Sequence, residues 1–372
     1  MITKQIWEKV ESFSHILLVA PRRVGKTSIL FNLLDNPKEN YRVLYFISES
    51  VNDENEFYKK LLQHINDSIQ GISKYLQQVK GFAKEFLSRI DRIDKDGVTL
   101  GGSKLNYYDE VVKFLKSEEF ENERIIILID EFAQTDANIY LDNKEDGRAK
   151  AVHFIQTVRA IRQMPELTKK VQFIFAGSIG LENIVANLNS SSAIGDLVPV
   201  TISPLSKSEA ENLCTKILNG SPYYFDEGAS DYLIEKIEWL IPFYIQLIID
   251  ESYKILLEKG SNNITRDTID IAIKNAIKHR NHFENWFGRL RKAYTGNEFN
   301  FVKDTLNLAS ENSTISSNDI FNLAVKYNIE NTFRDVINAL KHDGYINNDE
   351  NPKIYRFNSP ILKIWWCKNV AN

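Results

Sequence analysis

The feature that most constrains the fold is a short glycine-containing turn near the N-terminus. The apolar run Ile16–Ala20 predicts a buried strand before it, and a helical pattern follows to about Leu34. Between them, Arg22–Ser28 reads Arg-Arg-Val-Gly-Lys-Thr-Ser. This segment matches the second half of the pattern GxxxxGK[ST], with Ala20 in the place of the first glycine. A loop of this kind needs a strand before it and a helix after it, so the sequence predicts that the chain opens with an α/β unit.

Such a loop has a defined chemistry, because its backbone N–H groups converge on phosphate oxygens at the N-terminus of the helix. We expect these donors from six consecutive residues, namely Arg23, Val24, Gly25, Lys26, Thr27 and Ser28. Gly25 allows the backbone a close approach. The Lys26 side chain would reach the β and γ phosphates, and the Thr27 hydroxyl would bind Mg²⁺. The segment therefore predicts a site for a nucleoside triphosphate with Mg²⁺.

A second element has the composition of a central parallel strand. Ile125–Ile129 consists of five consecutive branched aliphatic residues, which is typical of a strand buried on both faces, and Asp130 and Glu131 follow at once. An apolar strand that ends in two acids is the Walker B arrangement. We expect Asp130 to hold the Mg²⁺ shell and Glu131 to orient and activate the attacking water. The pair predicts hydrolysis, and it argues against a module that only holds nucleotide.

A third strand, predicted at Val171–Ala176, ends in Gly177 and Ser178. Ser178 would lie beside the γ-phosphate if this strand neighbours both of the preceding strands. The alternative is that Ser178 only caps a helix at Ile179–Ala186, a position that serine favours.

Strand and helix patterns alternate through the first half of the chain, which predicts a parallel sheet with right-handed crossovers. Gln134–Gly147 is polar and is expected to be an exposed loop. We assign residues 1–204 to an α/β P-loop NTPase core. Its further strands are predicted at Arg42–Ile47 and Val198–Ile202, and its further helices at Glu54 to about Ile93, Tyr108–Leu115 and Arg148–Gln163.

The pattern changes after Pro204. Helical spacing dominates residues 205–294, beginning with a helix at Ser206–Leu218 whose N-cap is Ser206, and this predicts an all-helical lid domain. Residues 295–372 show three helical patterns, then two short strands at Tyr345–Ile346 and Ile354–Phe357 around a polar turn. Three helices and a hairpin predict a C-terminal winged-helix domain.

Composition excludes several classes of protein. The net charge is −4 and the pI is near 6.0, so there is no overall basic field for nucleic acid, although a local patch stays possible. Cys214 and Cys367 have no disulfide or metal-site spacing. The N-terminus does not resemble a signal peptide, and no apolar run approaches the ~18–20 residues of a membrane span. We expect a cytoplasmic protein without a membrane segment.

Taken in order, these segments resemble the archaeal-type ATPase family, in the STAND branch of the AAA+ P-loop NTPases. APRRVGKTS is similar to the family's Walker A, ILIDEF to its Walker B and FIFAGSIG to its sensor strand. LVPVTISPLSKSEAENL resembles the passage into the lid, and LKHDGYI and YRFNSPILKIWW resemble the end of the winged helix. The resemblance covers almost the whole chain and implies ATP as the nucleotide.

The segment WLIPFYIQL is similar to the lid segment whose proline, here Pro242, approaches the nucleotide in relatives. Ile241 stands where relatives often carry glycine, which weakens that assignment. An additional Gly-Arg element that often precedes the first strand of relatives is also not found here.

The placement of arginines bears on the rate of hydrolysis. No arginine occurs between Arg162 and Arg266, where ring-forming AAA+ motors place an arginine finger that is worth about 10³–10⁵ in rate. Arg159 and Arg162 precede the sensor strand and are expected on a solvated helix face. The resemblance to STAND proteins predicts this absence. It implies a slow ATP hydrolase that works as a nucleotide-controlled conformational switch for a protein partner or for self-assembly.

The alternative is a DNA-binding AAA+ ATPase, similar to origin-recognition or transposition-helper proteins, that uses its winged helix on DNA. Residues 296–372 hold eight Lys and Arg and nine Asp and Glu, a difference of −1, and the predicted wing tip at Asn347–Glu350 carries two acids. Such a domain offers few phosphate contacts, which favours a protein contact. The best local candidate for DNA is the basic and aromatic stretch Lys278–Lys292, whose aromatic residues either stack on bases or form one buried helix face.

Overall fold

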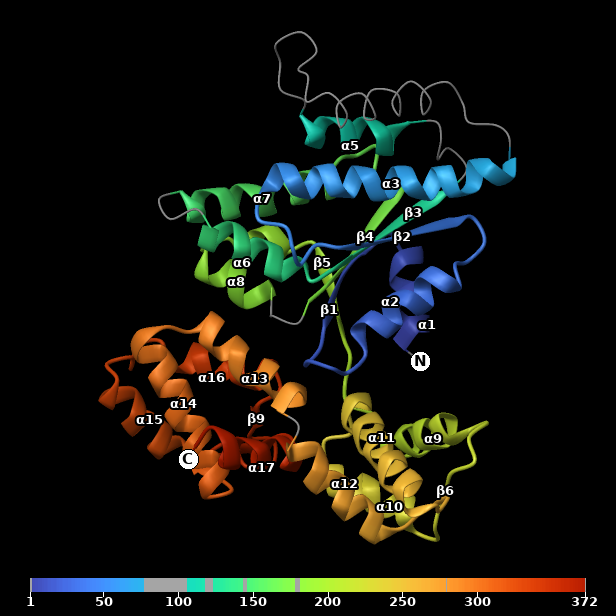
Figure 1. The fold of residues 1–372 in the computed structure, drawn as a ribbon. Coiled ribbons are helices and arrows are strands. Elements are labelled where there is room, and N and C mark those ends of the chain that lie inside the picture. Colours follow the sequence, from blue (N-terminus) through green and yellow to red (C-terminus); the bar gives the residue numbers. More distant parts are fainter. Residues whose placement is uncertain are drawn as a thin grey trace. The chain divides into compact units, whose positions relative to one another are not determined.

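The computed structural model describes residues 2–76, 106–117, 123–142, 146–177, 181–278 and 280–371 (Figure 1). They form two compact units. The first unit consists of Met1–Val19 and Lys26–Ile202, and the second consists of Ala20–Gly25 and Ser203–Asn372. The short loop Ala20–Gly25 therefore packs with the C-terminal half of the chain although it is flanked by elements of the first unit.

The first unit is built on a five-stranded parallel sheet with the strand order β2-β3-β4-β1-β5. The five predicted strands are confirmed, and the central strands β3 and β4 are buried on both faces as expected for a parallel sheet covered by helices. Strand β4 lies between β1 and β3, so the carboxyl ends of all three meet at one edge. The strands are β1 (His15–Val19), β2 (Tyr41–Ile47), β3 (Arg124–Asp130), β4 (Val171–Ala176) and β5 (Leu197–Thr201).

Helices cover both faces of this sheet (Figure 1). On one face lie α1 (Ile2–Glu11) and α2 (Lys26–Asp35). On the other face lie α3 (Glu54–Leu76), α5 (Tyr107–Lys116), α6 (Phe132–Asp142) and α7 (Gly147–Arg162), and α8 (Leu181–Asn187) packs on α6. The predicted helix from Glu54 is described as far as Leu76, and its expected continuation to Ile93 lies outside the described residues.

The prediction of an exposed loop at Gln134–Gly147 is wrong, because Phe132–Asp142 forms helix α6. Its polar residues led to that prediction, yet they serve the backbone of a neighbouring segment. The buried Thr135 donates its hydroxyl to the carbonyl of Ser48 at 2.7 Å, and Asn138 donates to the carbonyl of Glu49 at 2.9 Å. A polar helix face is stable here because it satisfies carbonyls beyond the end of β2.

The expectation that Arg162 lies on a solvated helix face is also wrong. Arg162 is 3% exposed, and its guanidinium makes a bidentate pair with Asp196 through Nε at 2.7 Å and Nη2 at 2.9 Å. It also donates to the carbonyl of Ala193 at 2.7 Å. This residue therefore ties α7 to the turn before β5, and its charge is neutralised where it is buried.

The second unit begins with a group of helices, as the sequence predicts. Ser206 caps the first of them in a capping box with Glu209. The helices are α9 (Lys207–Leu218), α10 (Ala229–Ile237), α11 (Pro242–Lys259), α12 (Arg266–Lys278) and α13 (Arg280–Ala293), and β6 (Tyr224–Phe225) pairs with β7 (Asn263–Ile264). On α13, Phe283 and Trp286 are fully buried and Phe287 is partly buried, so the first two form an internal helix face.

The rest of the second unit has the order of a winged helix, with three helices and a small antiparallel sheet, followed by a final helix. The sequence did not predict β8, a strand of two residues that is defined only by its pairing with β10. Trp365 and Trp366 of the final helix are buried. The elements are α14 (Gly296–Glu311), β8 (Ile315–Ser316), α15 (Ser317–Lys326), α16 (Phe333–His342), β9 (Ile346–Asn347), β10 (Ile354–Phe357) and α17 (Pro360–Asn369). Among the described helices, none has the length and apolar character that a bilayer crossing requires.

Candidate nucleotide-binding site

The glycine-containing turn connects β1 to α2. Its backbone is left-handed at Arg23, with φ of 63°, and at Gly25, with φ of 101°. Helix α2 then begins at Lys26. A Cβ on Gly25 would meet no other atom within 4 Å, so backbone conformation rather than lack of space favours glycine there. A turn of this kind directly before a helix can point several N–H groups toward one anion.

The first turn of α2 contacts the end of strand β3. The Thr27 hydroxyl donates to Oδ2 of Asp130 at 2.9 Å, although 103 residues separate the two in sequence. The other carboxylate oxygen, Oδ1, accepts the backbone N–H of Glu131 at 3.1 Å. Asp130 is 5% exposed, whereas Thr27 is exposed. A hydroxyl and a carboxylate are the hard oxygen donors that Mg²⁺ prefers, so these two residues fit that ion.

Glu131 occupies the turn between β3 and α6 in a left-handed backbone conformation, with φ of 58°. A non-glycine residue with positive φ is uncommon, and such residues concentrate at functional sites. Lys26, the first residue of α2, is 7% exposed. The structure thus brings Thr27 and Asp130 into contact, with Lys26 and Glu131 as their direct neighbours in sequence.

Sequence reasoning missed Tyr45 in β2, whose hydroxyl donates to the same Asp130 Oδ2 at 3.1 Å. Burial, and then the negative charge of Asp130, raise the pKa of the Tyr45 hydroxyl, so it stays a donor at neutral pH. Its ring packs against Phe31 of α2, with 4.8 Å between the ring centroids. The one available signal was a tyrosine two residues before the end of the strand, within the otherwise apolar run from Val43 to Ile47.

Two predicted site residues are not joined to this cluster by the structure. Ser178 lies outside the described residues, although β4, which precedes it, does neighbour both β1 and β3 as its predicted role requires. Pro242 is the first residue of α11 in the second unit. Both roles stay predictions.

The loop Ala20–Gly25 makes its own contacts within the second unit. The Arg23 guanidinium lies 3.9 Å from the ring centroid of Phe243, which follows Pro242 on α11. Arg22 donates from Nη1 to the carbonyl of Asn285 at 3.3 Å. The two arginines that precede Gly25 are thus held by α11 and α13, and a change of loop conformation would disturb both contacts.

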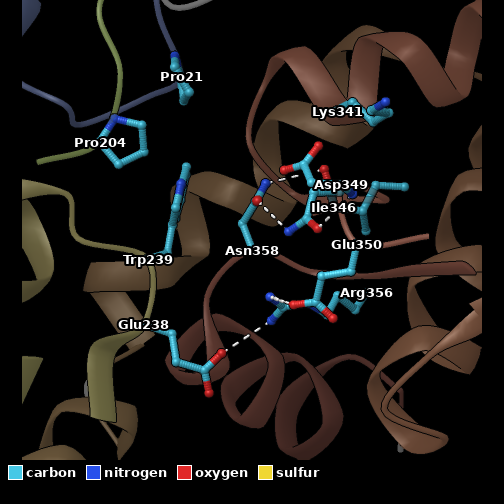
Figure 2. A pocket seen from close by; sticks show the side chains of 11 residues that line it. Pro21, Pro204, Glu238, Trp239, Lys341, Ile346, Asp349, Glu350, Arg356 and Asn358 are labelled. Carbon is cyan, nitrogen blue, oxygen red and sulfur yellow. Dashed lines mark hydrogen bonds and ion pairs between the residues drawn. The ribbon is translucent and has the colours of Figure 1, made fainter. Parts of the chain in front are cut away.

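A pocket of about 360 Å³ in the second unit is not the phosphate site (Figure 2). Pro21 is the only residue of the glycine-containing turn that lines it. Arg356 of β10 donates there to Glu238 at 3.1 Å and to Glu350 at 2.8 Å, so two acids neutralise its charge. Three acids line the pocket (Glu238, Asp349 and Glu350) against two cations (Lys341 and Arg356), so its charge does not favour a phosphate.

No family model and no curated protein matches this chain. Solved structures do match it along nearly its whole length. The Walker-type ATPase PABY2304 of Pyrococcus abyssi has a TM-score of 0.61 at 15% identity, over 98% of this chain and 94% of that chain. The ORC2 protein of Aeropyrum pernix, in its ADPNP–ADP complexes, has a TM-score of 0.57 at 11% identity, over 100% of this chain and 92% of that chain.

At such identities the similarity establishes the fold alone. The chain has the fold of a P-loop AAA+ core with a five-stranded parallel sheet, followed by a group of helices and a domain with the order of a winged helix. Membership of the STAND branch, which the sequence resemblance implies, stays a prediction.

Proposed function

We propose that this protein binds ATP with Mg²⁺, hydrolyses it slowly, and acts as a nucleotide-controlled conformational switch for a protein partner or for self-assembly. The observation that carries the proposal is the 2.9 Å contact between Thr27 and Asp130. It joins the helix after a glycine-lysine-threonine turn to the carboxyl end of a buried strand, at the edge where open α/β sheets bind ligands.

The residues take the following roles in this proposal. Backbone N–H groups from Arg23 to Ser28, Val24 and Gly25 included, receive the phosphates, and the Lys26 ammonium pairs with the β and γ phosphates. Thr27 and Asp130 hold Mg²⁺, which neutralises charge on the phosphate oxygens when bound. Glu131 orients the attacking water and accepts its proton. Ser178 contacts the γ-phosphate and Pro242 contacts the nucleotide, both on the strength of the resemblance, which also favours ATP over GTP.

Two observations support slow turnover and switching. Arg162 is committed to Asp196 in a buried bidentate pair, so this arginine, which precedes the sensor strand, does not serve as a finger. The loop that would receive the phosphates also carries Arg23, which stacks on Phe243 of α11. A nucleotide that changes the loop backbone therefore changes a contact of α11. A ligand shifts an equilibrium between two conformations only if it binds one of them more tightly than the other. The contact of Arg23 with Phe243 would supply this difference in affinity, because only one loop conformation retains it.

The contacts of the second unit favour a protein partner over DNA. Phe283 and Trp286 are fully buried, so they are not available to stack on bases. In the wing, Arg356 is paired with Glu238 and Glu350. Phosphate contacts supply most of the affinity of non-specific DNA binding, and a cation that is already paired with two acids is poorly placed to make one. The two free cysteines, Cys214 and Cys367, fit a reducing cytoplasm.

The second candidate is a DNA-binding AAA+ ATPase. The observation that favours it is the similarity in fold to the ORC2 protein of Aeropyrum pernix over the full length of this chain. It uses the same nucleotide site but applies the winged helix and the basic residues of Lys278–Lys292 to DNA.

Phosphate release from ATP with Mg²⁺ separates the two candidates. It should be measured for the wild type and for Glu131→Gln, with and without duplex DNA, together with the solution mass in ATP and in ADP. The proposed switch predicts slow release that is lost in Glu131→Gln and indifferent to DNA, and a mass or partner that changes with the nucleotide. Release that DNA stimulates manyfold would favour the DNA-binding candidate, and equal release by both proteins would show that Glu131 is not the general base.

A further inference from the structure

Helix α2 presents two residues to the same part of the sheet. Thr27 and Phe31 are four residues apart and so lie on one face of the helix. Thr27 donates to Asp130, and Phe31 packs on the ring of Tyr45, whose hydroxyl returns to the same Asp130 oxygen. Three side-chain contacts thus connect two residues of α2 to one carboxylate, directly through Thr27 and by way of Tyr45 through Phe31.

Strand register explains why a tyrosine is needed. Ile47 pairs with Asp130 in the parallel ladder, so Tyr45 lies two residues behind Asp130 on the neighbouring strand and points to the same face. Two residues of strand span roughly 7 Å. Only a long side chain with a terminal donor reaches forward over that distance, and the Tyr45 hydroxyl does so at 3.1 Å.

The carboxylate of Asp130 is therefore held at both oxygens by three donors. Oδ1 accepts the backbone N–H of Glu131, and Oδ2 accepts the hydroxyls of Thr27 and Tyr45. With 5% of its surface exposed, Asp130 receives little orientation from solvent. Its orientation depends on these three donors, and Tyr45 is the only one of them outside the two Walker segments.

We infer that Tyr45 is a positioning residue that fixes the Asp130 carboxylate for Mg²⁺, with Phe31 holding the Tyr45 ring in place. The inference rests on the proposed function, because it assigns the metal to Thr27 and Asp130. Tyr45 acts through Asp130, and it does not touch the nucleotide in this account.

The test is the Mg²⁺ dependence of ADP binding by the full chain. Calorimetry gives the Kd for ADP in EDTA and at a series of Mg²⁺ concentrations, for the wild type and for Tyr45→Phe. This substitution removes the hydroxyl but retains the ring and its contact with Phe31. We expect the Kd in EDTA to stay within about twofold. The Mg²⁺ concentration for half-maximal enhancement should rise about tenfold, the low end for the loss of one hydrogen bond to a charged acceptor.

Two further variants make the result specific. Tyr58→Phe is a matched control, because Tyr58 also donates its hydroxyl to a side chain, Thr157 at 2.9 Å, but lies on α3 over the other face of the sheet. It should titrate with Mg²⁺ like the wild type. Phe31→Ala removes the support of the Tyr45 ring and should raise the half-maximal Mg²⁺ concentration about threefold, less than Tyr45→Phe because the hydroxyl is still present.

The outcomes are distinguishable. One outcome is that Mg²⁺ strengthens ADP binding by the wild type and by Tyr45→Phe with the same half-maximal Mg²⁺ concentration. That result overturns the inference and leaves the proposed function intact. An equal shift in Tyr45→Phe and Tyr58→Phe also overturns it, since the effect would then be a general loss of stability. A wild type that binds no ADP with or without Mg²⁺ refutes the proposed function and the inference together.

Discussion

Acidification should weaken the first unit through His15 at the start of β1. The His15 ring is 7% exposed and bridges two elements, because Nδ1 accepts the backbone N–H of Phe173 at 3.1 Å and Nε2 bonds the carbonyl of Arg162 at 3.2 Å. Since Nδ1 is an acceptor, the ring is neutral and carries its proton on Nε2. A second proton on Nδ1 would face the N–H of Phe173 and break that bond.

Burial lowers the pKa of His15 from 6.5 to about 4, and the charge of Arg162 acts in the same direction. The folded-state pKa of His15 lies below the unfolded-state value. The contribution of neutral His15 to the free energy of unfolding is therefore fully present above pH 6.5 and is lost as pH falls toward 4. The gap between the two values corresponds to about 3 kcal/mol at about 1.4 kcal/mol per pH unit. From these two pKa values, proton linkage predicts that the free energy of unfolding falls by about 2 kcal/mol between pH 7 and pH 5.

The assay is urea denaturation of the wild type and of His15→Gln at several pH values between 7.5 and 4.5. Glutamine offers one donor and one acceptor in this position but does not titrate. The free energy of unfolding of the wild type should fall by about 2 kcal/mol more than that of His15→Gln from pH 7 to pH 5. Parallel pH profiles for the two proteins would refute the reasoning, because all other titrating groups are common to both.

Two other substitutions test buried positions. Gly344 has φ of 86°, and a Cβ there would lie 2.5 Å from the Trp239 ring, whereas Gly220 has φ of 79° and open space around it. Gly344→Ala should therefore lower the free energy of unfolding by roughly 2–4 kcal/mol and Gly220→Ala by only about 1 kcal/mol, and equal losses in urea denaturation would contradict the steric argument. Asp136 is fully buried, its carboxylate has no hydrogen-bond partner among the described residues, and burial raises its pKa to about 8. Because this value lies above the unfolded-state pKa, the free energy of unfolding of the wild type falls as pH rises from 4 to 8. Relative to the wild type, Asp136→Asn should therefore gain roughly 5 kcal/mol between pH 4 and pH 8 in urea denaturation, and parallel pH profiles would contradict this.

The strands of the core could be predicted because burial on both faces leaves a direct mark in the sequence. Ile125–Ile129 is a run of apolar residues, and Val171–Ala176 is apolar apart from Gln172, as expected for strands that helices cover on both faces of a parallel sheet. The turn after β1 could be predicted because its glycine, lysine and threonine occupy adjacent positions. In both cases the physical cause is local in sequence.

Features that depend on distant partners could not be predicted in this way. The polar sequence of α6 is typical of a loop, and it forms a helix here because residues such as Thr135 bond Ser48, which is 87 residues away. Arg162 is buried because it pairs with Asp196, which is 34 residues away and cannot be identified as its partner from the sequence. The contact of Tyr45 with Asp130 depends on the register between β2 and β3, which apolar runs do not specify.

The central claim, that the turn before α2 holds the phosphates of ATP with Mg²⁺, is tested most directly by nucleotide binding. Calorimetric titration of ATP in Mg²⁺ should be carried out with the wild type and with Lys26→Ala, after thermal denaturation has shown that both are folded. The account predicts one ATP per wild-type chain and an affinity at least roughly a hundredfold weaker in Lys26→Ala, because an ammonium–phosphate pair is lost. Equal affinity in the two proteins, or no binding by the wild type, would contradict it.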